Sequence, residues 1–340
     1  MMKINDHIPL KELFAIRGMA QVVTVTFGLV VLCIIFGILN PNFFSGENTL
    51  NLLRQIAPIL LIGISQSYVL ITGNIDLSIG SVVGMSTMIA STLMSKGGVN
   101  PWIALLITMA ACLTVGAANG LLVAKCKLPP FIATLGTMTI ARGIAQLANN
   151  NYNTDSIGKI LGDEAVQGFR DFFYYGSFLG IYNTIWIALV LWIAFNFLLG
   201  RTRTGRHIYA VGSNVEAARL SGVSVTATTV KAFLVSAFCS CVVGFILCAQ
   251  AGMGAMDAGN TYELYAVAAA VIGGVSTLGG QGLLIGTVIG ASIWGVLQNG
   301  LQFANVAVAW RNIIIGSIVI VSVLLDVIVR TGAKSKKVMK

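Results

Sequence analysis

The stretch Arg201 to Val225, RTRTGRHIYAVGSNVEAARLSGVSV, is a long polar and strongly basic segment inside an otherwise apolar chain. It holds one acid, Glu216, against four arginines: Arg201, Arg203, Arg206 and Arg219. A segment this polar does not enter lipid, and by the positive-inside rule its surplus of arginine keeps it in the cytoplasm. The stretch therefore predicts a loop of a membrane protein and the side of the membrane on which that loop lies.

The composition of the whole chain also predicts a membrane protein. The 340 residues are 56% hydrophobic and 10% charged, so a soluble fold would expose far too much apolar surface to water. The net charge of +9 comes mostly from segments predicted to lie inside the cell, and it requires no nucleic-acid partner. The six cysteines lack the paired spacing of a zinc site. We expect an all-α, polytopic integral membrane protein without a metal or cofactor.

Apolar runs recur along the chain at about the 20 residues that span a bilayer, and they predict about ten transmembrane helices. They lie at 19–39, 52–72, 79–94, 101–124, 131–148, 183–200, 229–251, 263–278, 282–302 and 310–329. The runs 79–94 and 263–278 are short. No small-residue cleavage site follows the first run, which therefore predicts a retained anchor and not a signal peptide.

The order of the runs predicts the topology. An even number of spans puts both termini on one side of the membrane, and the basic tail 330–340 places that side in the cytoplasm. On this count, 149–182 forms a periplasmic loop and 201–228 a cytoplasmic loop. Both belong to a single transmembrane domain of residues 1–340.

Within the basic loop, Val215 to Leu220 (VEAARL) is predicted to form a short amphipathic helix. Ser213 or Asn214 can cap its N-terminus, and Gly222 can end it. Such a helix offers a docking surface to a soluble partner. The alternative is an ordinary cytosolic loop whose charges only orient the neighbouring helices.

The pattern T-x-x-G-R-x-I-Y-A-V-G-x-N-x-E-A-A-R-L-S-G-V, from Thr202 to Val223, resembles the coupling loop of ribose-type ABC sugar-importer permeases. In that family the loop docks on a separate ATPase subunit, with a Glu-Ala-Ala element seated in a cleft of that subunit. The resemblance implies an ATPase-coupling site at Thr202, Gly205, Arg206, Gly212, Asn214, Glu216, Ala217, Ala218, Arg219 and Gly222.

The segment Gly73 to Gly80, GNIDLSIG, interrupts two apolar runs and contains Asp76. Placing a charged carboxylate inside the membrane costs free energy, which water, a partner group or helix ends must lower. Asp76 is therefore a candidate for the translocation path. The alternative is an acid in a loop at the cytoplasmic surface. The segment is similar to the Gly-Ile-Asp-Leu-Ser-Val-Gly-Ser signature of the same family, with Asn74 where a second glycine is usual.

Two further stretches resemble that family. Leu128 to Thr137 contains two prolines that mark a helix boundary, and Tyr262 to Gly274 has Tyr265 where an aspartate is usual. Together with the segment around Asp76, they give these candidates for the translocation path or a helix break: Gly73, Asn74, Asp76, Ser78, Phe131, Thr134, Glu263, Gly273 and Gly274.

Glycines also recur every four residues and predict small helix faces that allow close packing. These glycines are Gly80 and Gly84, Gly116 and Gly120, and Gly282, Gly286 and Gly290.

The motifs limit the classes of function that the chain can have. The chain has no G-x-x-x-x-G-K-[ST] loop and no Ser-His-Asp or HExxH arrangement, so it predicts neither an ATPase nor a hydrolase. The resemblance implies the bacterial inner-membrane permease subunit of an ATP-driven importer of a monosaccharide. Its implied partners are an ABC ATPase, a periplasmic sugar-binding protein, membrane lipid and a second permease, which forms a homodimer or a heterodimer.

The alternative function is an ion-coupled secondary carrier. Such carriers use acids within the membrane, and the acids available for this role are Asp76, Asp257, Glu263 and Asp326. Neither alternative fixes which sugar or solute is transported.

Overall fold

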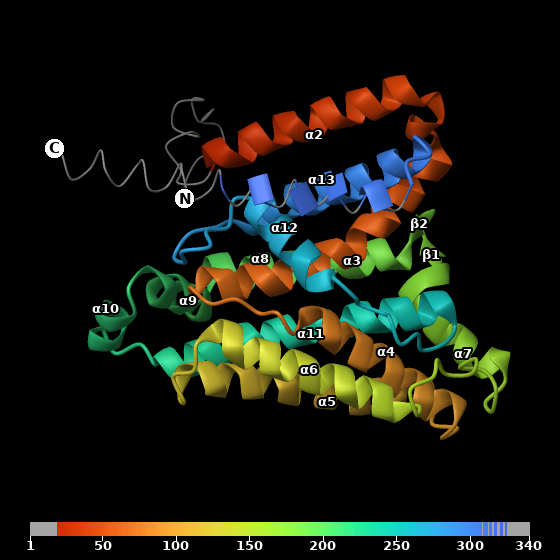
Figure 1. Ribbon diagram of the computed structural model, residues 1–340, viewed down its shortest axis with the longest axis horizontal. Helices are drawn as coiled ribbons and strands as arrows, with labels where there is room; N and C mark the ends of the chain where they lie inside the picture. The colour runs from red at the N-terminus through yellow and green to blue at the C-terminus, as the bar shows by residue number, and fades with distance from the viewer. Residues whose placement is uncertain are drawn as a thin grey trace, which may run out of the picture.

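Long apolar helices lie side by side in the computed structural model, which describes residues 19–307 and, beyond them, 309–311, 313, 314, 316, 317, 320, 321 and 324 (Figure 1). Among these described residues, the helices long and apolar enough to cross a membrane number seven: α2 (Met19–Leu39), α3 (Gly46–Ile71), α5 (Pro101–Ala124), α6 (Pro130–Ala148), α8 (Asn183–Arg201), α11 (Val225–Ala251) and α13 (Leu284–Phe303). Two shorter apolar helices are α4 (Ile79–Ser95) and α12 (Tyr262–Ile272). The predicted polytopic all-α class is confirmed. The run 310–329 lies largely outside the described residues, as do both basic termini.

Local sequence signals set the starts of several helices. Ser45 caps α3 by accepting a hydrogen bond from the Asn48 nitrogen at 3.2 Å, so this helix begins at Gly46 and not at the predicted residue 52. Pro101 and Pro130 lie in the first turns of α5 and α6, where the missing N–H leaves no helical bond unmade.

The region after α12 differs from the prediction. The apolar run 263–278 is not one helix, because α12 ends at Ile272 and residues 273–283 form an irregular connection. An 11-residue helix rises only about 16 Å, so α12 does not span the bilayer by itself. This connection is where several glycines of the candidate site lie.

The helices divide into buried and peripheral ones. Within the apolar windows of α3 and α11, 83% and 78% of the residues are buried inside the protein, whereas the corresponding shares for α2 and α8 are 11% and 17%. All four are strongly apolar, so the exposed side chains of α2 and α8 need lipid or a partner to cover them. The centre of the molecule is therefore the pair α3 and α11.

Small residues bring the central helices together, as predicted. A β-carbon on Gly116 of α5 would lie 2.7 Å from the Phe233 oxygen of α11, and one on Gly120 of α5 would lie 2.5 Å from the Val230 α-carbon of α11. Gly286 and Gly290 of α13 contact Gly273 and Ala269 in the same way. Gly282, the third predicted member of that series, precedes α13 and is not on its face, because the helix begins only at Leu284.

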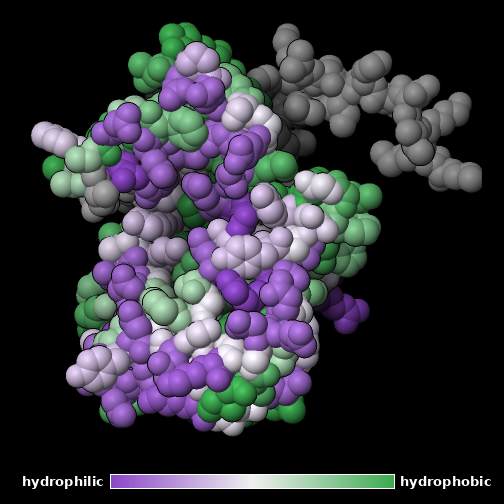
Figure 2. Space-filling view, turned by 90° about the vertical axis from the view of Figure 1, so that its right-hand side faces the viewer, coloured by the Kyte–Doolittle hydropathy of each residue, from purple (hydrophilic) through white to green (hydrophobic). Residues whose placement is uncertain are grey.

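Short helices, a hairpin and loops lie at the two ends of the helix array (Figure 1). One end carries α9 (Arg203–Ser213), α10 (Val215–Leu220) and the connection 273–283. The other carries α7 (Asp163–Arg170), the π-helical turn η2 (Asp171–Tyr175) and an antiparallel hairpin of β1 (Ser177–Phe178) and β2 (Ile181–Tyr182). Figure 2 faces this second end, where hydrophilic residues predominate and hydrophobic ones gather towards the margins. The loops 149–182 and 201–228 thus lie at opposite ends of the helices.

Candidate functional site

The predicted short helix of the basic loop is present as α10, with the predicted bounds Val215–Leu220. Of the two candidate caps, Asn214 is the one used, since its Oδ1 accepts a hydrogen bond from the Ala217 nitrogen at 2.9 Å. Gly222 ends the helix at φ +81° and donates its N–H to the Arg219 oxygen at 3.0 Å. A left-handed residue after the last turn is the usual end of a helix and favours glycine.

The outer surface of α10 is open to solvent. Ala218 is its one buried residue, and Leu220 is 89% exposed. Glu216 accepts a hydrogen bond from Arg219 at 3.0 Å, and both side chains are mostly exposed. An exposed ion pair of this kind adds little stability, so these groups remain available to a partner. The helix therefore presents a leucine flanked by one acid and one base.

The helix α9 is anchored against α8. Thr202 caps it by accepting a hydrogen bond from the Gly205 nitrogen at 3.3 Å, and the Thr202 hydroxyl donates to the Leu198 oxygen at 2.6 Å. A β-carbon on Gly205 would overlap the Leu199 oxygen. The tight turn from α8 into α9 thus requires a glycine, while Arg206 remains exposed.

The C-terminal end of α9 packs against the end of α3 and against the connection 273–283. A β-carbon on Gly212 would overlap the Ile71 oxygen at the end of α3 and lie 2.7 Å from the Gly280 nitrogen. Gly280 N–H donates to that same Ile71 oxygen at 2.8 Å. A β-carbon on Gly279 would lie 2.9 Å from Gly73. We call this contact of residues 71–73, 212–213 and 279–280 the glycine junction.

Tyr209 strengthens the same contact, because its hydroxyl donates to the Gly282 oxygen at 2.6 Å. Burial raises the pKa of Tyr209 to about 12, so the phenol keeps its proton at neutral pH and remains a donor. The residues of the basic loop therefore divide into an exposed set on α10 and a packed set on α9.

Asp76 lies three residues before Ile79, the first residue of α4, and is only 2% exposed. Its Oδ1 accepts hydrogen bonds from the Ser78 nitrogen at 2.8 Å and the Ser78 hydroxyl at 2.6 Å, and its Oδ2 accepts one from the Ser236 hydroxyl of α11 at 2.7 Å. No ion pair to Asp76 occurs among the described residues. The alternative of a solvated loop acid at the surface is wrong.

The hydrogen bonds of Asp76 continue into two further helices. The Asn119 amide of α5 donates to the Ser78 hydroxyl at 2.9 Å, and the Thr137 hydroxyl of α6 donates to Asn119 Oδ1 at 2.6 Å. All five side chains are buried. We call Asp76, Ser78, Asn119, Thr137 and Ser236 the Asp76 network. Asn119, Thr137 and Ser236 were not predicted from the sequence, where the available signal was a polar residue inside an apolar run.

The other predicted path residues lie at several places. Thr134 is buried and adjoins the network, because its carbonyl accepts from Thr137 at 3.1 Å. Phe131 is 55% exposed on the surface of α6. The Asn74 side chain donates to the Thr72 hydroxyl at 2.8 Å, at the end of α3. The structure thus joins Ser78 and Thr134 to Asp76 but leaves Phe131 outside the network.

The remaining candidates belong to α12 and the connection that follows it. Gly273 packs on Gly286 of α13, and Gly274 has φ +88°. Glu263, in the first turn of α12, lies against Gly80. Among the residues that the structure describes, no three His, Cys, Asp or Glu side chains come together as a metal site.

Comparison with known proteins assigns the chain to a family. Residues 48–323 match the family described as "Branched-chain amino acid transport system / permease component". The chain belongs to this family. It is therefore a multi-pass membrane subunit of a transport system and not an enzyme.

Curated relatives match along nearly the whole chain. The ribose import permease protein of Bacillus subtilis is 37% identical over 91% of this chain and 94% of its own length. The D-allose transport system permease protein of Escherichia coli is 35% identical over 88% and 90%, and the fructose import permease protein of Rhizobium meliloti is 32% identical over 90% and 85%. No solved structure matches this chain.

Proposed function

We propose that this chain is the membrane-spanning subunit of an ATP-driven importer of a monosaccharide. The main observation in support is that the exposed helix α10 directly follows the packed helix α9. An ATPase that acts on a permease needs both a docking surface and a connection from that surface to the membrane helices. The sugar as substrate class is supported by the ribose, allose and fructose permeases among the relatives. The family description names branched-chain amino acids, so leucine is the alternative substrate that the experiment must include.

The proposed topology has ten membrane segments and cytoplasmic termini, and one of these segments contains α12, which does not span the bilayer by itself. In it, the end with α9 and α10 faces the cytoplasm, and the end with α7 and the β-hairpin faces the periplasm, where a binding protein delivers the sugar. The basic residues of 201–225 and the separation of the two ends (Figure 1) support this orientation. The pore lies between two permease subunits, either two copies of this chain or this chain and a homologue.

In the proposed coupling, an ATPase subunit binds the exposed face of α10. Because α10 follows α9 after Asn214 alone, a displacement of α10 moves α9 as well. The glycine junction then passes the displacement to the end of α3 and to the connection before α13. Backbone packed on backbone transmits such a movement without the slack of long side chains.

The Asp76 network adjoins the glycine junction, because Asp76 follows Gly73 by three residues. The network therefore receives the displacement. Its carboxylate connects the start of α4 to α11 by way of Ser78 and Ser236, and Asn119 and Thr137 extend the connection to α5 and α6. We propose that the network keeps these helices in register as the path opens. The substrate itself is not bound tightly there, because tight binding would oppose release.

The proposal is tested with the full chain reconstituted with its ATPase and binding protein in vesicles. Labelled ribose, allose, fructose and leucine are offered in separate assays, with and without ATP. We expect ATP-dependent uptake of a sugar and none of leucine. Uptake that persists without ATP and stops with a protonophore would instead establish the secondary carrier. Of the four acids considered for that alternative, Asp76 is buried, Glu263 is partly buried, Asp257 is exposed and Asp326 lies outside the described residues, so the arms with ATP and with the protonophore decide between the two functions.

A further inference from the structure

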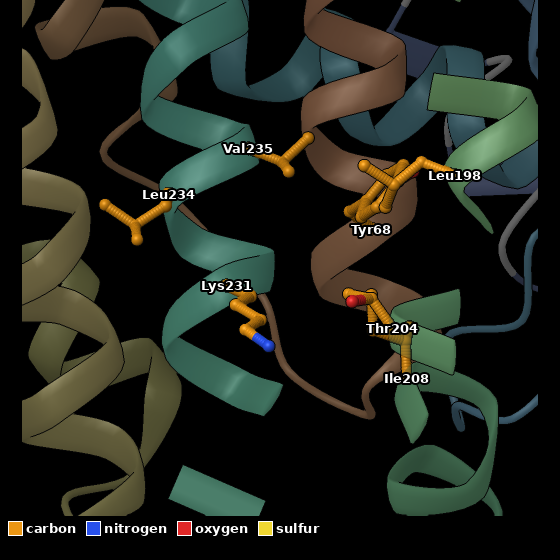
Figure 3. A pocket seen from close by; sticks show the side chains of 7 residues that line it. All are labelled: Tyr68, Leu198, Thr204, Ile208, Lys231, Leu234 and Val235. Carbon is orange, nitrogen blue, oxygen red and sulfur yellow. The ribbon is translucent and has the colours of Figure 1, made fainter. Parts of the chain in front are cut away.

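A crevice of about 260 Å³ opens between α8, α9 and α11, with α3 behind it (Figure 3). It is lined by the apolar side chains of Leu198, Ile208, Leu234 and Val235, by the ring of Tyr68 and by Thr204, and Lys231 lies at its rim. The lining is thus mostly apolar, with the Thr204 hydroxyl and the Lys231 ammonium group as polar groups. Lys231 and the residues of α8 belong neither to the exposed face of α10, nor to the glycine junction, nor to the Asp76 network.

The interior of the crevice is suited to hydrocarbon and not to a sugar. The hydroxyl of Tyr68 is already used, since it donates to the Phe195 oxygen at 2.6 Å. The rings of Phe195 and Phe238 lie 6.0 Å apart and bridge α8 and α11 one turn further into the helix array. A sugar placed here would leave its hydroxyl groups unpaired, which costs more than apolar contact returns.

The rim carries unbalanced positive charge. Lys231 is exposed, extends from α11 towards α9 (Figure 3), and has no carboxylate within 4 Å among the described residues. Arg203, next to the lining residue Thr204, is exposed as well. The one acid of the basic loop, Glu216, is already paired with Arg219. An anion at the rim would therefore meet cations without a competing carboxylate.

We propose that the crevice binds an anionic phospholipid of the cytoplasmic leaflet, with an acyl chain against Leu234 and Val235 and the phosphate at Lys231. The proposal rests on the orientation given under the proposed function, which puts this end of α11 at the headgroup level. Because Ile208 of α9 forms part of the wall, the bound lipid fills the space between α9 and α11. It thereby holds the coupling segment in place and makes transport sensitive to anionic lipid.

Lipid binding is measured on the full chain purified in detergent, by native mass spectrometry and by the shift of the melting temperature. Phosphatidylglycerol, phosphatidylethanolamine and inorganic phosphate are titrated separately. We expect phosphatidylglycerol to bind and stabilise the protein, and Lys231→Gln to weaken this binding about fivefold, as loss of one basic group at the headgroup level predicts. Lys125→Gln, which removes another exposed lysine that is not in the crevice, leaves the binding unchanged.

A second variant tests the hydrocarbon part. Leu234→Trp fills the crevice without altering charge and is expected to abolish the phosphatidylglycerol shift. Equal binding by wild type and Lys231→Gln, or equal binding of phosphatidylethanolamine, would overturn the proposal. Inorganic phosphate that reproduces the shift would show a simple anion site and would overturn it too. These assays contain no ATP or sugar, so their outcome is independent of whether the transport proposal holds.

Discussion

At the residue scale, Asp76 shows how a carboxylate is kept inside an apolar protein without a cationic partner. One backbone N–H and two hydroxyl groups, from Ser78 and Ser236, hold its two oxygens. Hydrogen bonds to a charged acceptor are roughly twice as strong as neutral ones. The residue therefore links the break after α3 to the central helix α11.

Replacing Asp76 is expected to slow transport in a graded way. Asp76→Asn keeps the shape but loses the charge-assisted strength of the bonds, about half per bond, so uptake slows while the protein still assembles. Asp76→Leu is worse, because it leaves buried donors unpaired at about 1–3 kcal/mol each. Maximal uptake rate and membrane abundance are measured for both, with the exposed Asp257→Asn as control. Wild-type uptake by Asp76→Leu would exclude a role of this residue in the path.

Gly212 gives a second test at this scale. Gly212→Ala places a methyl group into the Ile71 oxygen, and overpacking of this kind costs about 1–3 kcal/mol. We expect the junction to separate, so that ATP hydrolysis continues while sugar uptake per ATP falls. Gly200→Ala is the matched control, because nothing lies within 4 Å of the β-carbon there. An unchanged ratio of uptake to hydrolysis in Gly212→Ala would show that the junction transmits nothing.

At the scale of elements, α9 and α10 perform different tasks although they follow each other directly. The first is held by glycines and by Tyr209, and the second is held by little more than Ala218 and its caps. A weakly held, exposed helix next to a rigid one is well placed to receive a partner and pass on its movement.

The α10 surface is tested by Glu216→Lys, which places a like charge beside Arg219 and reverses the charge offered to a partner. We expect the ATPase to be retained less well and coupled transport to fall, with the abundance of the chain unchanged because the side chain is 72% exposed. Leu220→Ala should act in the same direction, because the Leu220 side chain is 89% exposed and can contact a partner without contributing to the core.

The control for α10 is Leu179→Ala, which alters an exposed leucine at the opposite end, in the β-hairpin turn. If both α10 variants retained the ATPase as well as this control does, the docking surface would have to lie elsewhere. Altered membrane insertion in Glu216→Lys would instead support the view that the loop charges only orient the helices.

At the scale of the whole molecule, the native cysteines allow the orientation to be measured. Cys126, between α5 and α6, is exposed, whereas Cys112, Cys239, Cys241 and Cys248 are buried. We expect a membrane-impermeant maleimide to label Cys126 in inside-out vesicles but not in intact cells stripped of their outer membrane. Cys126→Ser is the blank, and Leu179→Cys in that background should label only from outside. Labelling of both positions from one side would contradict the proposed topology.

Features that depend on residues close together in the chain could be predicted from the sequence alone. Apolar runs predicted the helices, since lipid and protein interiors both select apolar side chains over about 20 residues. The bounds of α10 followed from a cap, helix formers and a glycine within ten residues of one another. The family could also be predicted, because its motifs in the basic loop and around Asp76 are contiguous in the chain.

Features that join residues far apart in the chain became visible only in the packed structure. Hydropathy predicted α3 and α8 alike, yet one is buried by protein and the other is mostly exposed, because an apolar side chain suits both surroundings. The burial of Asp76 depends on Ser236, 160 residues away, and the position of Gly212 depends on Ile71 and Gly280. Such contacts arise when helices pack, and local patterns of polarity carry no information on which helices will meet.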